Sequence, residues 1–60
     1  MTNIFLRVPL SEKMLFAKHL SIMIRSGMSI LDSLWLLKKQ AKTRSFKKIL
    51  DQIIVNIDNG

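Results

Sequence analysis

The stretch that decides the fold is residues 16–37, which read FAKHLSIMIRSGMSILDSLWLL. Phe16, Leu20 and Met23 recur at the spacing that places side chains on one face of an α-helix. Gly27 can take the left-handed backbone conformation that ends a helix, and Ser29 can cap the next helix with its hydroxyl. We therefore expect two amphipathic helices that lie side by side and roughly antiparallel about a tight turn.

The segment before this hairpin, residues 1–10, shows no helical periodicity. Pro9 disfavours a helical conformation at the residue before it, so the sequence predicts an extended lead-in. The first helix is then expected over about 12–26, with the side chain of Ser11 as its N-cap.

The rest of the hairpin and the chain after it predict helices over about 30–41 and 44–58, the latter capped by Thr43. In the third helix, apolar residues three and four positions apart form the expected core face: Phe46, Ile49, Leu50, Ile53 and Ile57. Ile54 lies toward the flank of that face. No segment alternates as a strand does, so the predicted fold class is all-α, a three-helix up-down-up bundle.

The chain carries more apolar residues than so small an interior can enclose. Sixty residues without a cysteine form at most one small domain of marginal stability, yet 48% of them are hydrophobic. We therefore expect the leftover apolar surface to be buried against another chain, most simply a second copy in a homodimer, or against the rest of a longer protein. The candidate residues for this contact are Trp35, Leu36 and Ile54. Leu36 falls on the polar side of its helix, where it is either an ordinary exposed side chain or part of a partner surface.

Positive charge gathers around the second predicted turn. The formal net charge is +6, and six cations lie close together there: Lys38, Lys39, Lys42, Arg44, Lys47 and Lys48. This basic face is either simply solvated or attracts an anionic membrane surface or an acidic partner. Nucleic acid is not expected, because the third helix offers few polar side chains that reach base edges, and Asp51 would repel phosphate.

The inventory of residues argues against an enzyme. His19 has no acidic residue at its helical neighbour positions, so a structural or partner-contact role is expected for it. The serines near helix starts are explained as caps. One histidine, four acidic residues and no cysteine disfavour a zinc or calcium site. We expect no catalytic, cofactor-binding or metal residues, and no cofactor.

Residues 10–60 resemble the repeated domain of the type II secretion system F family, the inner-membrane platform proteins of type II secretion and type IV pilus assembly. The likeness is carried, in order, by Phe16, Leu20, Gly27, Met28, Ser29, Ile30, Leu34, Leu37, Gln40, Leu50, Ile53, Val55 and Gly60. It implies an all-α domain of about six helices, of which residues 11–60 would be the first half. The family's further helices and transmembrane segment are absent from this sequence, so we expect a truncated or degenerate member completed by self-association.

The resemblance also implies a function. It points to a non-enzymatic scaffold segment at the cytoplasmic face of the bacterial inner membrane, with the motor ATPase and other inner-membrane components as partners. The segment itself has no apolar run long enough to span a bilayer. Two other classes stay open: a basic membrane-active peptide such as a leaderless bacteriocin, and a small helix-turn-helix DNA-binding protein.

Overall fold

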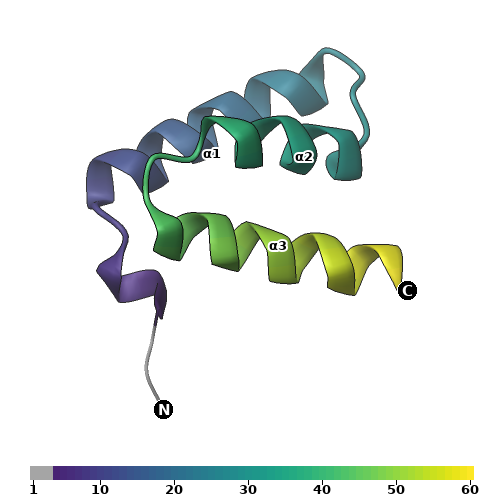
Figure 1. Cartoon of the computed structure of the whole chain (residues 1–60). Helices are drawn as coiled ribbons and strands as arrows, with labels where there is room; N and C mark the ends of the chain where they lie inside the picture. The colour runs from purple at the N-terminus through teal and green to yellow at the C-terminus, as the bar shows by residue number, and fades with distance from the viewer. Residues whose placement is uncertain (1–3) are drawn as a thin grey trace.

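The computed structural model describes residues 4–60, and every regular element within them is a helix (Figure 1). A short 3-10 helix, η1 (Ile4–Arg7), is followed by three α-helices: α1 (Leu10–Arg25), α2 (Ile30–Gln40) and α3 (Arg44–Asp58). Because residues 4–60 contain no strand, the predicted all-α class is confirmed. Residues 1–3, the start of the predicted lead-in, lie outside the described part of the chain.

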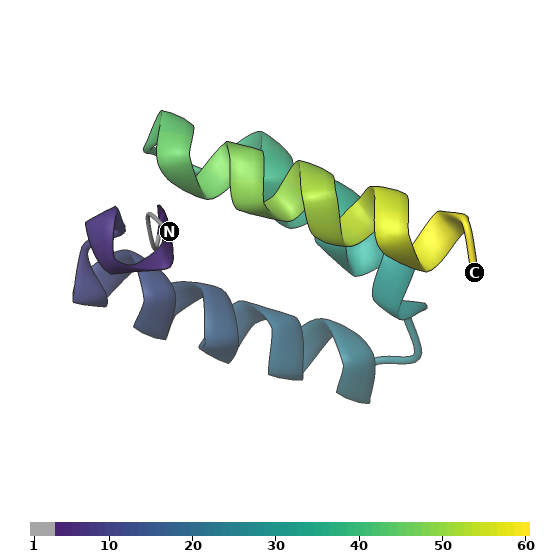
Figure 2. The ribbon, with the colours of Figure 1, turned by 90° about the horizontal axis from the view of Figure 1, so that it is seen from below.

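The three helices are arranged around α2. It packs against α1 and against α3, while η1 packs against α3. Successive helices run in opposite directions (Figures 1 and 2). α1 meets α3 through Phe16 and Phe46, whose rings pack edge to face with centroids 5.1 Å apart. Completion of these helices into a larger bundle by a second copy stays a prediction.

The turn between α1 and α2 is closed by a pair of backbone hydrogen bonds. The N–H of Gly27 donates to the carbonyl of Ile24 over 3.1 Å, and the N–H of Met28 donates to that of Met23 over 3.1 Å. This Schellman pattern needs a left-handed residue just past the helix end, and Gly27 has a φ of +98°. A glycine takes this conformation without the clash that a Cβ would cause.

Side-chain oxygens cap the starts of α2 and α3. The hydroxyl of Ser29 accepts a hydrogen bond from the N–H of Asp32 at 3.0 Å. That of Thr43 accepts one from the N–H of Phe46 at 3.2 Å. Each bond satisfies a donor that the first turn of a helix leaves without an intrahelical partner, so both helix starts are fixed by local chemistry.

α1 begins at Leu10, before the predicted start, and the prediction that Ser11 caps it is wrong. Pro9 occupies the N-cap position, with φ −57° and ψ 143° and no side-chain cap bond. Its carbonyl accepts the N–H groups of Glu12 and Lys13 at 3.1 and 3.2 Å. The helix starts directly after the proline because the ring fixes φ at a value that suits a helix entry.

The predicted extended lead-in is also wrong for the part of it that the structure describes. Ile4–Arg7 form a 3-10 turn, and the N–H of Val8 donates to the carbonyl of Phe5 over 3.3 Å. Val8 is buried in the core. Burying such a side chain is worth about 1.5–3 kcal/mol, which is enough to hold a segment without periodicity against α3.

The core is built mainly from α2 and α3. Its buried cluster is Val8, Leu34, Phe46, Leu50 and Ile54. No side chain of α1 is fully buried. On α3, Ile53 and Ile57 are exposed while Ile54 is only 5% exposed, so the core face runs along 46, 50 and 54. The expected core positions of Ile53 and Ile57 are therefore wrong: several adjacent apolar residues fit more than one helical stripe, and packing against α2 selects among them.

Candidate partner-binding surface

Five of the six predicted basic residues are exposed around the connection between α2 and α3. α2 gives way at Ala41 to extended backbone, with φ −62° and ψ 132°, and α3 follows after Lys42 and Thr43. The five exposed residues are Lys39, Lys42, Arg44, Lys47 and Lys48, which we call the basic surface. Cations near the end of α2 suit the negative pole of that helix.

Lys38, the sixth predicted residue, is engaged within the molecule. Its Nζ forms a salt bridge with Oδ1 of Asp51, which joins α2 to α3. The same Nζ lies 4.8 Å from the centroid of the Trp35 ring, a cation–π contact. Lys38 therefore contributes less charge to the surface than the sequence suggests, and Asp51 is partly neutralised.

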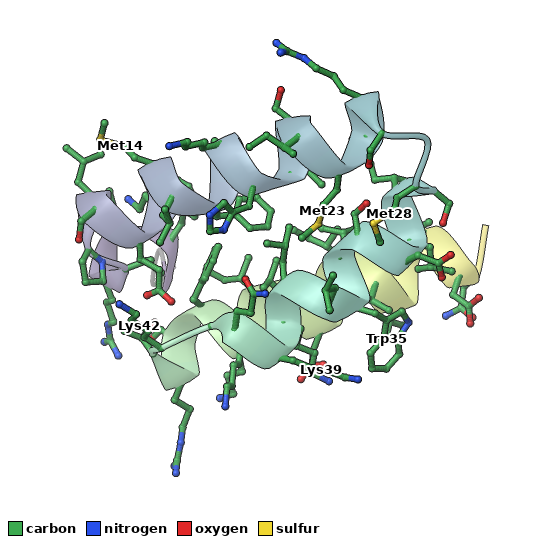
Figure 3. The ribbon with its side chains drawn as sticks, turned by 90° about the horizontal axis from the view of Figure 1, so that it is seen from above. Met14, Met23, Met28, Trp35, Lys39 and Lys42 are labelled. Carbon is green, nitrogen blue, oxygen red and sulfur yellow. The ribbon has the colours of Figure 1, made fainter. Side chains whose placement is uncertain are left out.

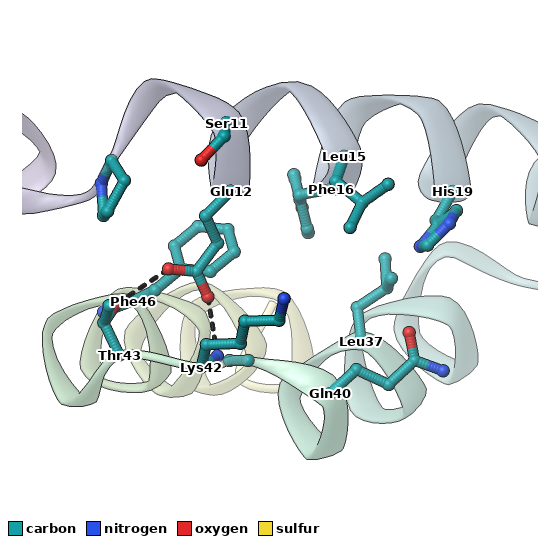
Figure 4. A pocket seen from close by; sticks show the side chains of 12 residues that line it. Ser11, Glu12, Leu15, Phe16, His19, Leu37, Gln40, Lys42, Thr43 and Phe46 are labelled. Atoms are coloured by element: carbon teal, nitrogen blue, oxygen red, sulfur yellow. Dashed lines mark hydrogen bonds between the residues drawn. The ribbon is translucent and has the colours of Figure 1, made fainter.

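Glu12 ties the start of α1 to the same connection. Its Oε2 accepts the backbone N–H of Lys42 at 2.7 Å, and its Oε1 accepts the hydroxyl of Thr43 at 3.0 Å. Both carboxylate oxygens are thus directed into the chain rather than toward solvent (Figure 4). No sequence pattern predicted these two bonds, since nothing local signals donors about 30 residues farther along the chain.

The three residues predicted for self-association do not share one surface. Trp35 and Leu36 are 47% and 39% exposed, and both are on α2. In Figure 3, Trp35 and Lys39 lie on the side of α2 away from α1. Ile54 belongs to the buried core. The prediction that Ile54 contacts a second copy is therefore wrong, because Ile54 lies on the face of α3 that packs into the core.

A small pocket lies between the first half of α1 and the α2–α3 connection (Figure 4). Its volume is about 190 Å³, and its lining is Pro9, Ser11, Glu12, Leu15, Phe16, His19, Leu37, Gln40, Ala41, Lys42, Thr43 and Phe46. Drug-sized ligands occupy pockets of roughly 300–1,000 Å³, so this one has room for a single side chain. No sequence pattern predicted it, because its walls come from three separate helices.

His19 lines this pocket, but the arrangement around it is not that of an acid–base pair. Leu15 and Phe16 stand between His19 and Glu12 in Figure 4, and Glu12 is directed toward Thr43 instead. Among residues 4–60, no three His, Cys, Asp or Glu side chains come together in a way that could hold a metal ion. The described part of the chain also has no helix of the length and apolarity that crossing a bilayer requires.

Comparison with known proteins gives a family. The family described as type II secretion system (T2SS), protein F, matches residues 16–60, which takes in most of α1 and all of α2 and α3. The type IV pilus assembly protein PilC of Thermus thermophilus is 29% identical over 51 residues, which is 85% of this chain and 13% of that protein. The chain therefore spans a small part of that relative's length. No solved structure matches it. With three quarters of its residues inside the match, the chain belongs to the type II secretion system protein F family.

Proposed function

We propose that this chain is a non-enzymatic scaffold segment of an inner-membrane platform protein for type II secretion or type IV pilus assembly. The observation that carries the proposal is membership of the protein F family over residues 16–60, supported by the likeness to a pilus assembly protein. A scaffold acts through contacts rather than chemistry. The exposed apolar and basic side chains of this chain are the features that suit such a role.

The first contact we propose is with a second copy. The described helices would be half of a larger bundle, and α1 leaves several large apolar side chains exposed: Leu10, Met14, Leu15, Ile22 and Ile24. On α2, Trp35 and Leu36 add to the exposed apolar area. A homodimer is the simplest assembly that covers such surfaces, because a two-fold axis buries the same patch on both copies.

The second contact is with the motor ATPase or another component of the assembly machinery, on the cytoplasmic side of the inner membrane. The basic surface is the proposed contact, since its five cations are exposed and favour an acidic partner. The nearby Asp51 is already paired with Lys38. Lys38 is left out of this surface because it already pairs with Asp51.

Binding of the 60-residue chain to the motor ATPase of its own secretion or pilus system tests the proposal. Reversing Lys39 and Lys42 to Glu should weaken binding roughly tenfold and reduce its sensitivity to salt. The matched control reverses Lys18 and Arg25, which lie on α1 and change the net charge equally. Equal binding by both variants and the wild type would remove the basic surface from the contact. A chain that binds neither the ATPase nor itself would refute the scaffold role.

A further inference from the structure

One end of the molecule collects most of its positive charge. η1, the start of α1, the end of α2 and the start of α3 lie together there, at the left of Figure 1. We call this the basic end. It carries six of the chain's ten cations: Arg7, Lys13, Lys42, Arg44, Lys47 and Lys48. Five of these are exposed, whereas Lys13 is half-buried and its Nζ lies 4.1 Å from the centroid of the Phe5 ring.

The acidic residues cancel only a small part of this charge. Glu12, the one carboxylate at the basic end, has an oxygen on the N–H of Lys42 and the other on the hydroxyl of Thr43. Asp51 pairs with Lys38. Asp32 is in the first turn of α2 and Asp58 closes α3, both at the opposite end of the molecule. The chain is therefore electrically polarised along its length, and the basic end would attract an anionic surface.

The most exposed large apolar side chains lie at the same end. Leu6 is 74% exposed, Leu10 69% and Met14 63%. Arg7 and Lys13 alternate with them along the chain. In Figure 3, Met14 points outward from α1, away from α2. All three apolar residues precede Phe16, so they lie outside the range that matches the protein F family.

The segment that presents these side chains is anchored. Val8 is buried against α3, and Glu12 is bonded to the α2–α3 connection, so the residues between and beside them are held in place. Exposed apolar side chains on a fixed scaffold, with cations at the same end of the molecule, are typical of a surface that enters the boundary between lipid headgroups and acyl chains. An acidic protein or a nucleic acid would use the cations and leave Leu6, Leu10 and Met14 in water.

We propose that the basic end docks onto an anionic phospholipid surface, with Leu6, Leu10 and Met14 inserted at the interface and the five exposed cations of this end, Arg7, Lys42, Arg44, Lys47 and Lys48, paired with phosphate headgroups. Each lysine or arginine near such a surface strengthens partitioning severalfold, and the apolar tips supply the second signal that stable attachment needs. This inference rests on the charges and exposures of this chain. It uses Lys42, Arg44, Lys47 and Lys48 of the basic surface together with Leu10 and Met14, so one copy cannot bind lipid and the partners proposed above through these residues at the same time.

Sedimentation with lipid vesicles tests the proposal. The 60-residue chain should bind vesicles of phosphatidylcholine mixed with phosphatidylglycerol, bind phosphatidylcholine vesicles much more weakly, and lose affinity as salt is raised. Arg44→Glu should lower partitioning about tenfold. Its control is Arg25→Glu, the same charge change at the opposite end, which should stay within about threefold.

The design separates docking from loss of folding. A glutamate in the first turn of α3 suits the helix dipole, whereas one in the last turn of α1 does not, so instability would affect the control more than the test variant. For the apolar tips, Met14→Ser should lower partitioning about fivefold, and Ile22→Ser, at an exposed position farther along α1, should have little effect.

Four outcomes would overturn the proposal. Equal binding to both kinds of vesicle would show that anionic headgroups are not recognised. Equal losses of binding for Arg44→Glu and Arg25→Glu would show that only the net charge of the chain matters, and not the basic end. Duplex DNA bound at a salt concentration that releases the vesicles would indicate a nucleic-acid surface instead. Release of a dye trapped in the vesicles would indicate a membrane-permeabilising peptide rather than a docking surface.

Discussion

The carboxylate of Glu12 and the hydroxyl of Thr43 lie 3.0 Å apart, and this contact joins the first turn of α1 to the cap of α3. Thr43 has two roles in this contact, since its hydroxyl donates its proton to Glu12 while its oxygen accepts the N–H of Phe46. The cap of α3 is therefore oriented by a residue from another helix. The contribution of this hydrogen bond to the free energy of unfolding can be measured by mutating Glu12 and Thr43.

Glu12→Ala should lower the free energy of unfolding by about 1–2 kcal/mol, because it removes two charge-assisted hydrogen bonds that are partly open to solvent. Urea denaturation followed by circular dichroism measures the change. Ser11→Ala is the control, since Ser11 is exposed and makes no cap bond, and it should shift stability by less than about 0.5 kcal/mol. A larger loss for Ser11 than for Glu12 would contradict the observed start of α1.

A double-mutant cycle between Glu12→Ala and Thr43→Val should give a coupling energy of about 1 kcal/mol, because each change removes the same bond. Valine keeps the volume of threonine but cannot cap α3, so Thr43→Val alone also loses the bond to Phe46. Strictly additive effects would show that Glu12 acts on Lys42 alone.

Gly27→Ala should lower the free energy of unfolding by about 1–2 kcal/mol, because alanine disfavours the backbone conformation at this position. The φ of Gly27 is +98°, and a Cβ added there would meet nothing within 4 Å, so the penalty is conformational rather than steric. Gly27→Asn should cost less, because asparagine tolerates the left-handed region better than alanine does. Thermal unfolding of the two variants checks the order, and an alanine variant as stable as the wild type would contradict the turn described above.

Leu50→Ala and Ile53→Ala distinguish the observed core face of α3 from the expected one. Leu50 is completely buried, so its truncation should cost about 2–5 kcal/mol and leave much of the chain unfolded at room temperature. Ile53 is partly exposed, so Ile53→Ala should lower the free energy of unfolding by roughly 1 kcal/mol or less. Far-UV circular dichroism of both variants, measured side by side, would show the reverse order if Ile53 faced the core.

Leu36→Glu tests the proposed self-association. A charge at this partly exposed position should leave the fold intact, yet it should shift the association equilibrium toward the monomer by about tenfold or more if the two-fold contact includes α2. Sedimentation equilibrium over a range of concentrations measures the shift. The control is Gln52→Glu, an exposed position on α3 that carries no apolar surface. Equal dissociation constants for the two variants would exclude Leu36 from the contact.

The parts of the structure that could be predicted from sequence are those set by neighbours along the chain. Gly27 ends α1 because glycine readily takes the left-handed conformation, and Ser29 caps α2 because its hydroxyl reaches the N–H of Asp32. The α1–α2 turn and the start of α2 therefore follow from short-range chemistry. The helical class follows from the same spacing. The resemblance to the protein F family is also carried in part by residues in and around this turn.

The parts that could not be predicted depend on residues far apart in the chain. Val8 has no periodic neighbours, and only its burial against α3 shows that it belongs to the core. Ile53, Ile54 and Ile57 are all apolar, so periodicity alone cannot decide which of them faces α2. Lys38 looked like part of the basic surface because its partner, Asp51, is on another helix.

The burial of Val8 has a consequence for how α1 comes apart from the rest. No side chain of α1 is fully buried, which alone would make the free energy of separating this helix from α2 and α3 small. However, Val8 holds the chain just before the helix, and the tight turn at Gly27 holds it just after, so both ends are fixed. Peeling must then also extract Val8 and reopen a closed loop. Amide hydrogens of α1 should consequently exchange together with those of α3, in one concerted opening of the whole chain.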